Sequence, residues 1–175
     1  MVRYLETTQE LELTYGSMDN AVVGYTDTDH TSQHHWHSIS GYTFLIGGGA
    51  VTWGSKKQPV IALSTMEAEY IVVAHTMKEA LWLWAFIGKL TMTLVAPTMV
   101  HCNNQATIAL SKNGQHHTWT KHIDIRFHFI CKAVTCKSIS LIYCHTGSMM
   151  ADLLTKPFNC TKTAEHTSGL GLLPA

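Results

Sequence analysis

Short apolar runs bounded by polar residues or glycine occur along most of the chain and predict β-strands. The expected strands cover residues 10–15, 21–26, 39–46, 50–53, 98–102 and 138–143. Gly47, Gly48 and Gly49 separate two of these runs, and they favour a tight hairpin turn because glycine adopts positive φ without steric cost. A phosphate-binding loop is the alternative, but the segment lacks both the G-x-G-x-x-G spacing and a following helix.

The strongest helical pattern begins at Ser64. Apolar side chains then recur every three or four positions over about 25 residues, which places them on one face of a helix. That face comprises Met66, Tyr70, Val73, Met77, Leu81 and Trp84. Ser64 or Thr65 is the expected N-cap, and the Glu67 carboxylate lies in the first turn, where it suits the helix dipole. Weaker patterns predict helices at 104–110, 121–134 and 148–154.

The order of these elements predicts one layered α/β domain. Strands and a hairpin come first, a long helix follows, and single strands then alternate with helices. Such an order is typical of a mixed sheet with helices packed against it. The length of 175 residues suffices for one domain with a substantial core.

Composition narrows the class of protein. Lys and Arg number 12, as do Asp and Glu, so the net charge is zero and no strong field attracts nucleic acid or an anionic membrane. Charged residues make up only 14% of the chain, and the 12 histidines equal Lys and Arg combined. The apolar fraction of 46% argues against disorder.

The chain is expected to be intracellular, with cytoplasm and nucleus not distinguished. Its longest near-apolar stretch, residues 81–87, is far shorter than the roughly 20 residues of a membrane span, so no membrane partner is expected. The first ten residues contain no signal-peptide core. Five cysteines without a C-x-x-C pair indicate reduced thiols.

Acidic residues are few, so their positions point to candidate chemistry. Asp27 ends a predicted buried strand, Glu67 and Glu69 begin the long helix, and Asp152 lies in the last predicted helix. Carboxylates gathered at one edge of a sheet bind hard divalent cations such as Mg²⁺. Glu67 and Glu69 flank the apolar stripe of the helix symmetrically, so their spacing leaves open which of them faces such a site.

Seven segments follow one another along the chain: GYTDTD (24–29), SISGYTFLIGGGAVTWGSKKQ (38–58), ALSTMEAEYIVVA (62–74), KEALWL (78–83), CNNQATIAL (102–110), TKHIDIRFHFI (120–130) and ADLLTKP (151–157). In this order they resemble the ribonuclease H domain of copia-type (LTR) retrotransposon Pol polyproteins. The resemblance implies an RNase H-like domain at 20–158, and it leaves residues 159–175 as a tail of undetermined structure. Residues 1–19 resemble the connection after the reverse transcriptase, so a reverse transcriptase domain, absent from this chain, is an expected partner.

The resemblance further implies an RNase H-like fold, with a five-stranded mixed sheet flanked by helices, and metal-dependent hydrolysis of the RNA strand of RNA–DNA hybrids. The family's catalytic carboxylates match Asp27, Asp152 and Glu69, which is the second glutamate of the E-A-E-Y segment. These three residues are the expected ligands of Mg²⁺, with Mn²⁺ as an alternative ion.

The fourth catalytic position departs from the family, which carries Asp where this chain has Asn103. Asn keeps the shape of Asp but brings no negative charge, so a second cation is expected to bind more weakly. By analogy with the loss of one preorganised electrostatic group, the expected loss in rate is at least ~10²–10³-fold. Trp84, Trp119 and Cys131 stand where the family commonly has Arg, which implies a decaying copy. The alternative function is therefore a catalytically dead remnant that at most binds nucleic acid.

Contacts between phosphates and Lys or Arg dominate nucleic acid binding. The candidate cations for an RNA–DNA hybrid are Lys56, Lys57, Lys121 and Arg126, and the candidates for base stacking are Trp53 and Trp119. A solvated surface for the lysines and ordinary packing for Trp53 are the alternatives.

A histidine-rich zinc module is a third hypothesis. Its candidate ligands are His34, His35 and His37, or His116, His117 and His122 with Cys131 and Cys136. Structural zinc sites usually pair C-x₂₋₄-C with a following H-x₃₋₅-H, and the chain does not reproduce that motif as a whole. His122 and Asp124 match a family motif, and we expect them at a helix start, with His122 near substrate as the alternative.

Overall fold

The computed structural model describes residues 6, 8–16, 21–29, 37–92, 96–112 and 121–175, with only the backbone of Lys121 and His122. The strands are β1 (Leu11–Leu13), β2 (Val23–Asp29), β3 (Ile39–Ile46), β4 (Gly49–Lys57), β5 (Thr98–Cys102), β6 (Ile139–Tyr143) and β7 (Leu172–Pro174). The α-helices are α2 (Thr65–Thr91), α3 (Gln105–Lys112), α4 (Lys121–Thr135) and α5 (Cys160–Gly169). Two 3₁₀ helices, η1 (Thr146–Ser148) and η2 (Met150–Leu154), follow β6.

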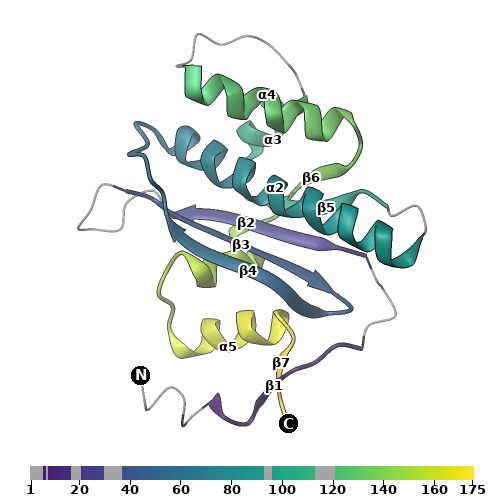
Figure 1. The fold of residues 1–175 in the computed structure, drawn as a ribbon. Helices are drawn as coiled ribbons and strands as arrows, with labels where there is room; N and C mark the ends of the chain where they lie inside the picture. Colours follow the sequence, from purple (N-terminus) through teal and green to yellow (C-terminus); the bar gives the residue numbers. More distant parts are fainter. Residues whose placement is uncertain (1–5, 7, 17–20, 30–36, 93–95, 113–120) are drawn as a thin grey trace.

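Five strands form one mixed sheet in the order β4-β3-β2-β5-β6 (Figure 1). The strands β2, β3 and β4 are antiparallel neighbours, whereas β2, β5 and β6 run parallel. Thr26 of β2 is in register with Cys102, the last residue of β5. The sequence therefore predicted the sheet type correctly. The same register brings Asn103, the residue after β5, beside Asp27, the residue after Thr26.

The predicted hairpin is confirmed. Gly47 and Gly48 form the turn between β3 and β4 with φ of 60° and 86°, values that glycine adopts without strain. The strand β4 continues to Lys57, past the predicted end at Trp53, because its outer half is an exposed edge with no apolar run to mark it. The strand β2 likewise continues past Asp27, which pairs with Gly41 of β3 inside the sheet.

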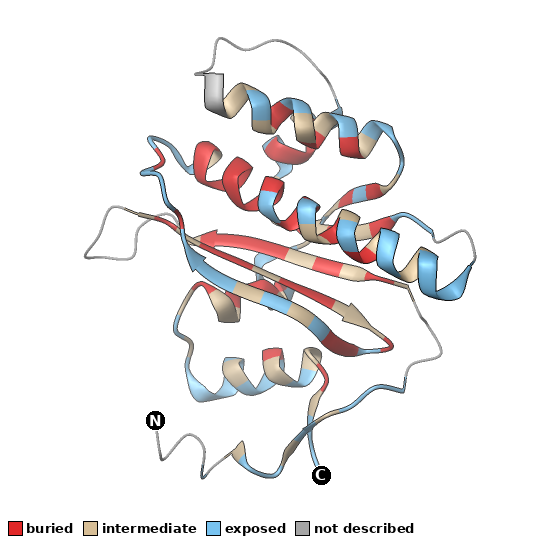
Figure 2. Cartoon of the chain, in the orientation of Figure 1, coloured by how far each residue is buried: buried red, intermediate tan, exposed pale blue. Residues whose placement is uncertain are grey.

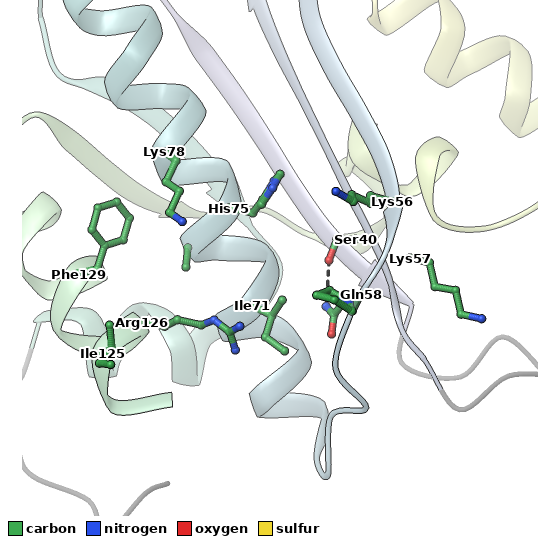
Figure 3. Close-up of a pocket in the computed structure, with 12 residues that line it drawn as sticks. Ser40, Lys56, Lys57, Gln58, Ile71, His75, Lys78, Ile125, Arg126 and Phe129 are labelled. Atoms are coloured by element: carbon green, nitrogen blue, oxygen red, sulfur yellow. Dashed lines mark hydrogen bonds between the residues drawn. The ribbon is translucent and has the colours of Figure 1, made fainter. Parts of the chain in front are cut away.

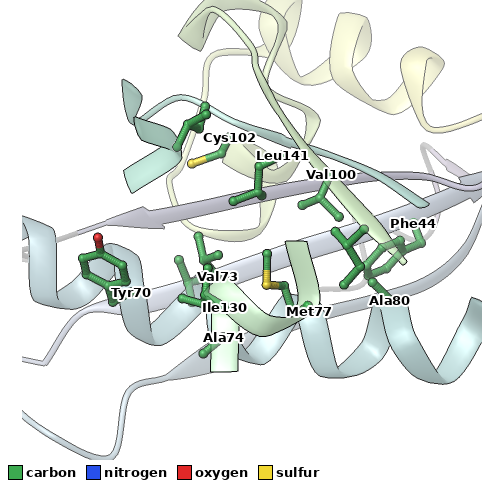
Figure 4. Packing of buried hydrophobic residues seen from close by; sticks show 14 of the residues in the cluster. Phe44, Tyr70, Val73, Ala74, Met77, Ala80, Val100, Cys102, Ile130 and Leu141 are labelled. Carbon is green, nitrogen blue, oxygen red and sulfur yellow. The ribbon is translucent and has the colours of Figure 1, made fainter. Parts of the chain in front are cut away.

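Helices cover both faces of the sheet. The helices α2, α3 and α4 lie on one face, and η2 and α5 lie on the other (Figure 1). The main core fills the space between the sheet and the first group, with Phe44, Tyr70, Met77, Val100 and Ile130 almost fully buried (Figure 4). Since burial of each such side chain contributes about 1.5–3 kcal/mol, the core fixes α2 firmly against the strands.

The long helix α2 begins as predicted, with Ser64 as its N-cap. The Ser64 Oγ accepts a hydrogen bond from the Glu67 amide at 3.2 Å. By length and hydropathy alone α2 could cross a membrane. The sequence did not suggest this, because its longest near-apolar stretch covers only residues 81–87. Twelve of its 27 residues are buried, mostly in its first two thirds (Figure 2), so its apolar character is that of a core helix.

Residues 159–175, for which the sequence predicts no element, form α5 and β7. Asn159 caps α5 by accepting a hydrogen bond from the Lys162 amide at 3.0 Å. The strand β7 pairs antiparallel with β1, so the two ends of the described chain lie together on the α5 side of the sheet (Figure 1).

Candidate active site

Asp27 is the centre of the candidate site. It lies in the middle strand β2, and its side chain is 1% exposed. Its Oδ1 accepts a hydrogen bond from Asn103 Nδ2 at 3.0 Å. Its Oδ2 accepts one from Thr155 Oγ1 at 2.6 Å and lies 3.2 Å from the Lys156 ammonium. Both oxygens of this buried carboxylate therefore have donors from distant parts of the chain.

Asn103 directly follows β5. Because β2 and β5 are parallel and in register at Thr26 and Cys102, their carboxyl ends place Asn103 next to Asp27. The amide donates where an aspartate would add a second negative charge. The structure thus brings Asn103 beside Asp27, to which it donates a hydrogen bond.

Asp152 joins the cluster from η2, and it is 3% exposed. Lys156 lies one helical turn further along, with its Nζ 3.2 Å from Asp152 Oδ1 as well as from Asp27 Oδ2. Burial, the charge of Asp27 and a hydrogen bond shared with that carboxyl raise the pKa of Asp152, while Lys156 opposes the shift. The single ammonium of Lys156 therefore neutralises two neighbouring carboxylates only in part.

Glu69 is the glutamate of α2 that belongs to the cluster. Burial is the main cause that raises the pKa of Glu69 to about 8, and the charge of Asp27 is the second. Lys156 lowers this pKa, but its effect is smaller. Its Oε2 is buried and has no hydrogen-bond partner among the described residues. Glu67 has a different task, since its Oε2 accepts a hydrogen bond from the Leu63 amide at 2.8 Å. Tertiary structure thus resolves the choice that the helix periodicity left open.

These residues fit a hard divalent cation in their chemistry. Asp27, Glu69 and Asp152 offer only oxygen donors, they are nearly fully buried, and one Glu69 oxygen is unpaired among the described residues. As the side chains stand, no three His, Cys, Asp or Glu groups in the described ranges are arranged to hold a metal ion. Asn103 and Lys156 each contact one Asp27 oxygen in this arrangement, so a cation would compete with them for that carboxylate.

Sequence reasoning missed Thr155 and Lys156, the two further residues that contact Asp27. Both lie in the quoted segment ADLLTKP, and the spacing of four between Asp152 and Lys156 was a signal for an ion pair on one helical turn. Thr155 lies 128 positions from Asp27 in the sequence, so no local pattern reveals their contact.

Three of the four predicted nucleic-acid-binding cations lie around one cavity. Lys56 and Lys57 at the end of β4 and Arg126 of α4 line a space of about 310 Å³ (Figure 3). The Lys121 side chain lies outside the described residues. Trp53 is 59% exposed and lines a different cavity, together with Leu154 and Leu170, while Trp119 lies outside the described ranges.

The candidate zinc ligands are only partly placed. His34, His35, His116 and His117 and the His122 side chain lie outside the described residues. Within the described ranges, the His37 Nδ1 is 2.8 Å from the Gln58 carbonyl oxygen, Cys131 contacts the Leu110 carbonyl, and Cys136 is exposed. These contacts bring no candidate zinc ligands together.

Solved structures identify the fold. RNase H1 from the halophilic archaeon Halobacterium salinarum NRC-1 matches with a TM-score of 0.57 at 15% identity, over 77% of this chain and 94% of that one. LC11-RNase H1 in complex with RNA/DNA hybrid matches with a TM-score of 0.56 at 14% identity, over 77% and 93%. The chain thus has an RNase H-like fold, as its sheet order and helix layers indicate.

Curated relatives identify the family, although no family model matches the chain. The retrovirus-related Pol polyprotein from transposon TNT 1-94 of Nicotiana tabacum is 41% identical over 157 residues, or 89% of this chain. That from transposon RE1 of Arabidopsis thaliana is 32% identical over 149 residues, or 85%. The chain belongs to the RNase H-like domains of copia-type retrotransposon Pol polyproteins. It spans only 12% and 10% of the length of these two relatives.

Proposed function

We propose that this chain is a metal-dependent RNase H-like domain for the RNA strand of RNA–DNA hybrids, and that Asn103 impairs its activity. The observation that carries the proposal is the convergence of Asp27, Glu69 and Asp152 in one buried cluster, with Asn103 hydrogen-bonded to Asp27. The hybrid bound in the LC11-RNase H1 structure supports the substrate class. The Pol polyprotein relatives support a reverse transcriptase domain as partner, joined through residues 1–19.

A bound Mg²⁺ or Mn²⁺ would supply an activated water for attack on phosphorus and would stabilise the leaving oxygen. Asp27, Glu69 and Asp152 would hold the ion. Glu69 must first release its proton, because its pKa of about 8 keeps it mostly protonated at neutral pH. Asn103 and Lys156 compete for the lone pairs of Asp27, so this chain is expected to bind the ion weakly.

The second candidate function is a non-catalytic remnant that at most binds nucleic acid. The specific observation in its favour concerns Asp27, whose two carboxylate oxygens both have partners. Asn103 and Thr155 donate hydrogen bonds to them, and Lys156 forms an ion pair. Asp27 itself is therefore stabilised without a metal, because the ammonium and the two uncharged donors offset its buried negative charge.

Replacement of one residue separates the two functions. Asn103→Asp should raise the affinity for Mn²⁺, measured by calorimetry, and should increase cleavage of a labelled RNA–DNA hybrid by about 10²-fold or more, since it restores a charged oxygen ligand. The matched control is Asn104→Asp, which adds the same charge at the next residue. Asn104 caps α3 by accepting a hydrogen bond from the Thr107 amide at 3.0 Å, a role that Asp also fills.

Each outcome decides between the proposals. Cleavage by Asn103→Asp but not by Asn104→Asp shows an intact fold silenced by one missing charge. Efficient cleavage by the native chain would show that Asn103 is tolerated, and the proposed impairment would be wrong. Absence of cleavage and of Mn²⁺ binding in Asn103→Asp would favour the remnant.

A further inference from the structure

The helix α5 carries a buried histidine that the proposed function does not use. His166 is 3% exposed, and it is the buried residue of this otherwise partly or fully exposed helix. Its Nδ1 is buried and has no hydrogen-bond partner among the described residues. The Phe158 ring lies tilted against the imidazole, with the two ring centroids 5.4 Å apart. Packing, and not a hydrogen bond at Nδ1, therefore holds this side chain.

His166 lies on the face of α5 that packs against the rest of the molecule. Gly169 and Leu170 follow it by three and four positions, so they share this face. A Cβ at Gly169 would lie 2.6 Å from Met150 Sδ of η2, which shows how closely the helix approaches η2. The Leu170 carbonyl accepts a hydrogen bond from the Ala50 amide of β4 at 2.9 Å. A change that displaces His166 therefore acts on the contacts of α5 with both η2 and the hairpin.

Charged groups on α5 itself disfavour a charged imidazole at this position. The Lys162 ammonium, one helical turn earlier, lies 5.7 Å from the centroid of the same Phe158 ring. Burial, followed by the charge of Lys162, lowers the pKa of His166. The Glu165 carboxylate opposes the shift, but this residue is exposed to water.

The elements that pack on α5 or continue its layer do not supply a close carboxylate either. Their titratable residues are Asp152 of η2, Lys56 and Lys57 of β4, and Glu12 of β1. The strand β7 has none. Asp152 is ion-paired with Lys156, the two lysines lie at the opposite end of β4 from Ala50, and Glu12 is exposed.

Protonation changes what the imidazole needs from its surroundings. In the charged form both ring nitrogens carry a proton, and the described residues offer Nδ1 no acceptor. A buried charge without a hydrogen bond is much less stable than a buried neutral ring. The neutral form of His166 therefore fits the packed helix, whereas the charged form is stabilised when the helix opens to water.

We propose that His166 is a pH-sensitive latch: its neutral side chain holds α5 against η2 and the hairpin, and its protonation in mildly acidic solution releases α5 together with β7. The inference goes beyond the proposed function, since it concerns the support of η2 and needs no metal or nucleic acid. It gives the buried histidine of α5 a role that the carboxylate cluster does not have.

The direction of the pH dependence distinguishes His166 from that cluster. The pKa of His166 in the fold lies below its ordinary value of 6.5, so its contribution to stability is present above pH 6.5 and is lost as pH falls below it. The pKa values of Glu69 and Asp152 are raised, mainly by burial, so their contributions are lost as pH rises. A loss of protection in mild acid therefore has the sign of the histidine.

The experiment measures hydrogen exchange of the full chain in EDTA by mass spectrometry, between about pH 7.5 and pH 5.5, with the rates corrected for intrinsic exchange. The test variants are His166→Gln, which keeps a polar side chain without titration, and His166→Phe, which keeps a ring against Phe158. The control is His128→Gln, which removes a histidine of α4 whose side chain is 59% exposed. Titration of the native imidazole by NMR gives a second readout that requires no variant.

The expected result is exchange in α5 and β7 that becomes faster by about fivefold or more on acidification, in the native chain and in His128→Gln, because an unpaired buried charge destabilises the closed helix. Both His166 variants should lose this rise, and β2 and β5 should not show it in any of the chains. An equal rise in the His166 variants, or acceleration throughout the sheet, would overturn the proposal. So would a native His166 that titrates at or above pH 6.5, even if both variants were already open at pH 7.5.

Discussion

At the scale of single residues, the site is governed by an imbalance of buried charge. Three carboxyl groups, from Asp27, Glu69 and Asp152, share one ammonium, that of Lys156. Asn103 relieves part of the repulsion by donating to Asp27 where an aspartate would increase it. The same substitution that removes a metal ligand is therefore expected to stabilise the metal-free fold.

Glu69→Gln should make the metal-free protein less sensitive to pH. The pKa of Glu69 rises from 4.5 to about 8 on folding, so its contribution to stability is present below pH 4.5 and is lost as pH rises through 8. In EDTA at pH 8 the variant should be more stable than the native chain by up to about 4 kcal/mol, and near pH 4.5 the difference should nearly vanish. Urea unfolding at both pH values measures this.

The exposed Glu165 of α5 provides the control for that comparison, because Glu165→Gln removes the same charge from a solvent-exposed position. A native-like pH dependence in Glu69→Gln, equal to that of Glu165→Gln, would show that Glu69 is not the buried acid proposed here.

At the scale of elements, the site depends on how closely η2 packs against the sheet. A Cβ at Gly41 of β3 would lie 2.6 Å from Thr155 Cγ2 and 3.0 Å from the Ala151 carbonyl oxygen. Gly41 is also the partner of Asp27 in the sheet. Glycine at this position therefore lets η2 bring Asp152, Thr155 and Lys156 to Asp27.

Gly41→Ala should push η2 away from the sheet. The expected cost is about 1–3 kcal/mol in the free energy of unfolding, typical of an added methyl group in a packed interior. Gly16→Ala is the control, since nothing lies within 4 Å of its added Cβ. Chemical denaturation compares the two variants, and equal stability would show that η2 is not held by this close approach.

At the scale of the whole molecule, the two ends of the chain are joined beneath the sheet. The Thr14 amide donates to the Gly171 carbonyl at 2.8 Å, and the Ala50 amide donates to the Leu170 carbonyl at 2.9 Å. Tyr15 adds a hydrogen bond from its hydroxyl to the Ala50 carbonyl at 2.8 Å. These contacts attach β1, β7 and α5 to the hairpin end of β4, on the opposite face from the main core.

Gly171→Ala should loosen this assembly without unfolding the sheet. Gly171 has a φ of 86°, and a Cβ there would lie 2.7 Å from Gly49 Cα, so alanine is strained in both backbone and contacts. Hydrogen exchange should become faster by about tenfold or more in β1, α5 and β7 but not in β2 or β5, if the ends form a separate cooperative unit. Faster exchange throughout would show that they unfold with the core.

The sequence alone determined much of this fold because the relevant signals are local. Apolar periodicity placed the strands β2, β3, β5 and β6, the glycine pair predicted the hairpin, and Ser64 marked the start of α2. These features depend on residues within a few positions of one another, where spacing and side-chain type suffice. The ordered motifs added the family and the candidate residues Asp27, Glu69, Asn103 and Asp152.

Only the tertiary structure decided what those residues do to one another. Asn103 and Asp27 are 76 positions apart and Thr155 and Asp27 are 128 apart, so their hydrogen bonds arise from strand register and the packing of η2. Glu69 faces the cluster, whereas Glu67 accepts a hydrogen bond from the Leu63 amide. The cavity lined by Lys56, Lys57 and Arg126 likewise forms only where β4, α2 and α4 meet. Burial sets the pKa values of the carboxyl groups and leaves buried polar atoms unpaired among the described residues, and it exists only once these elements pack.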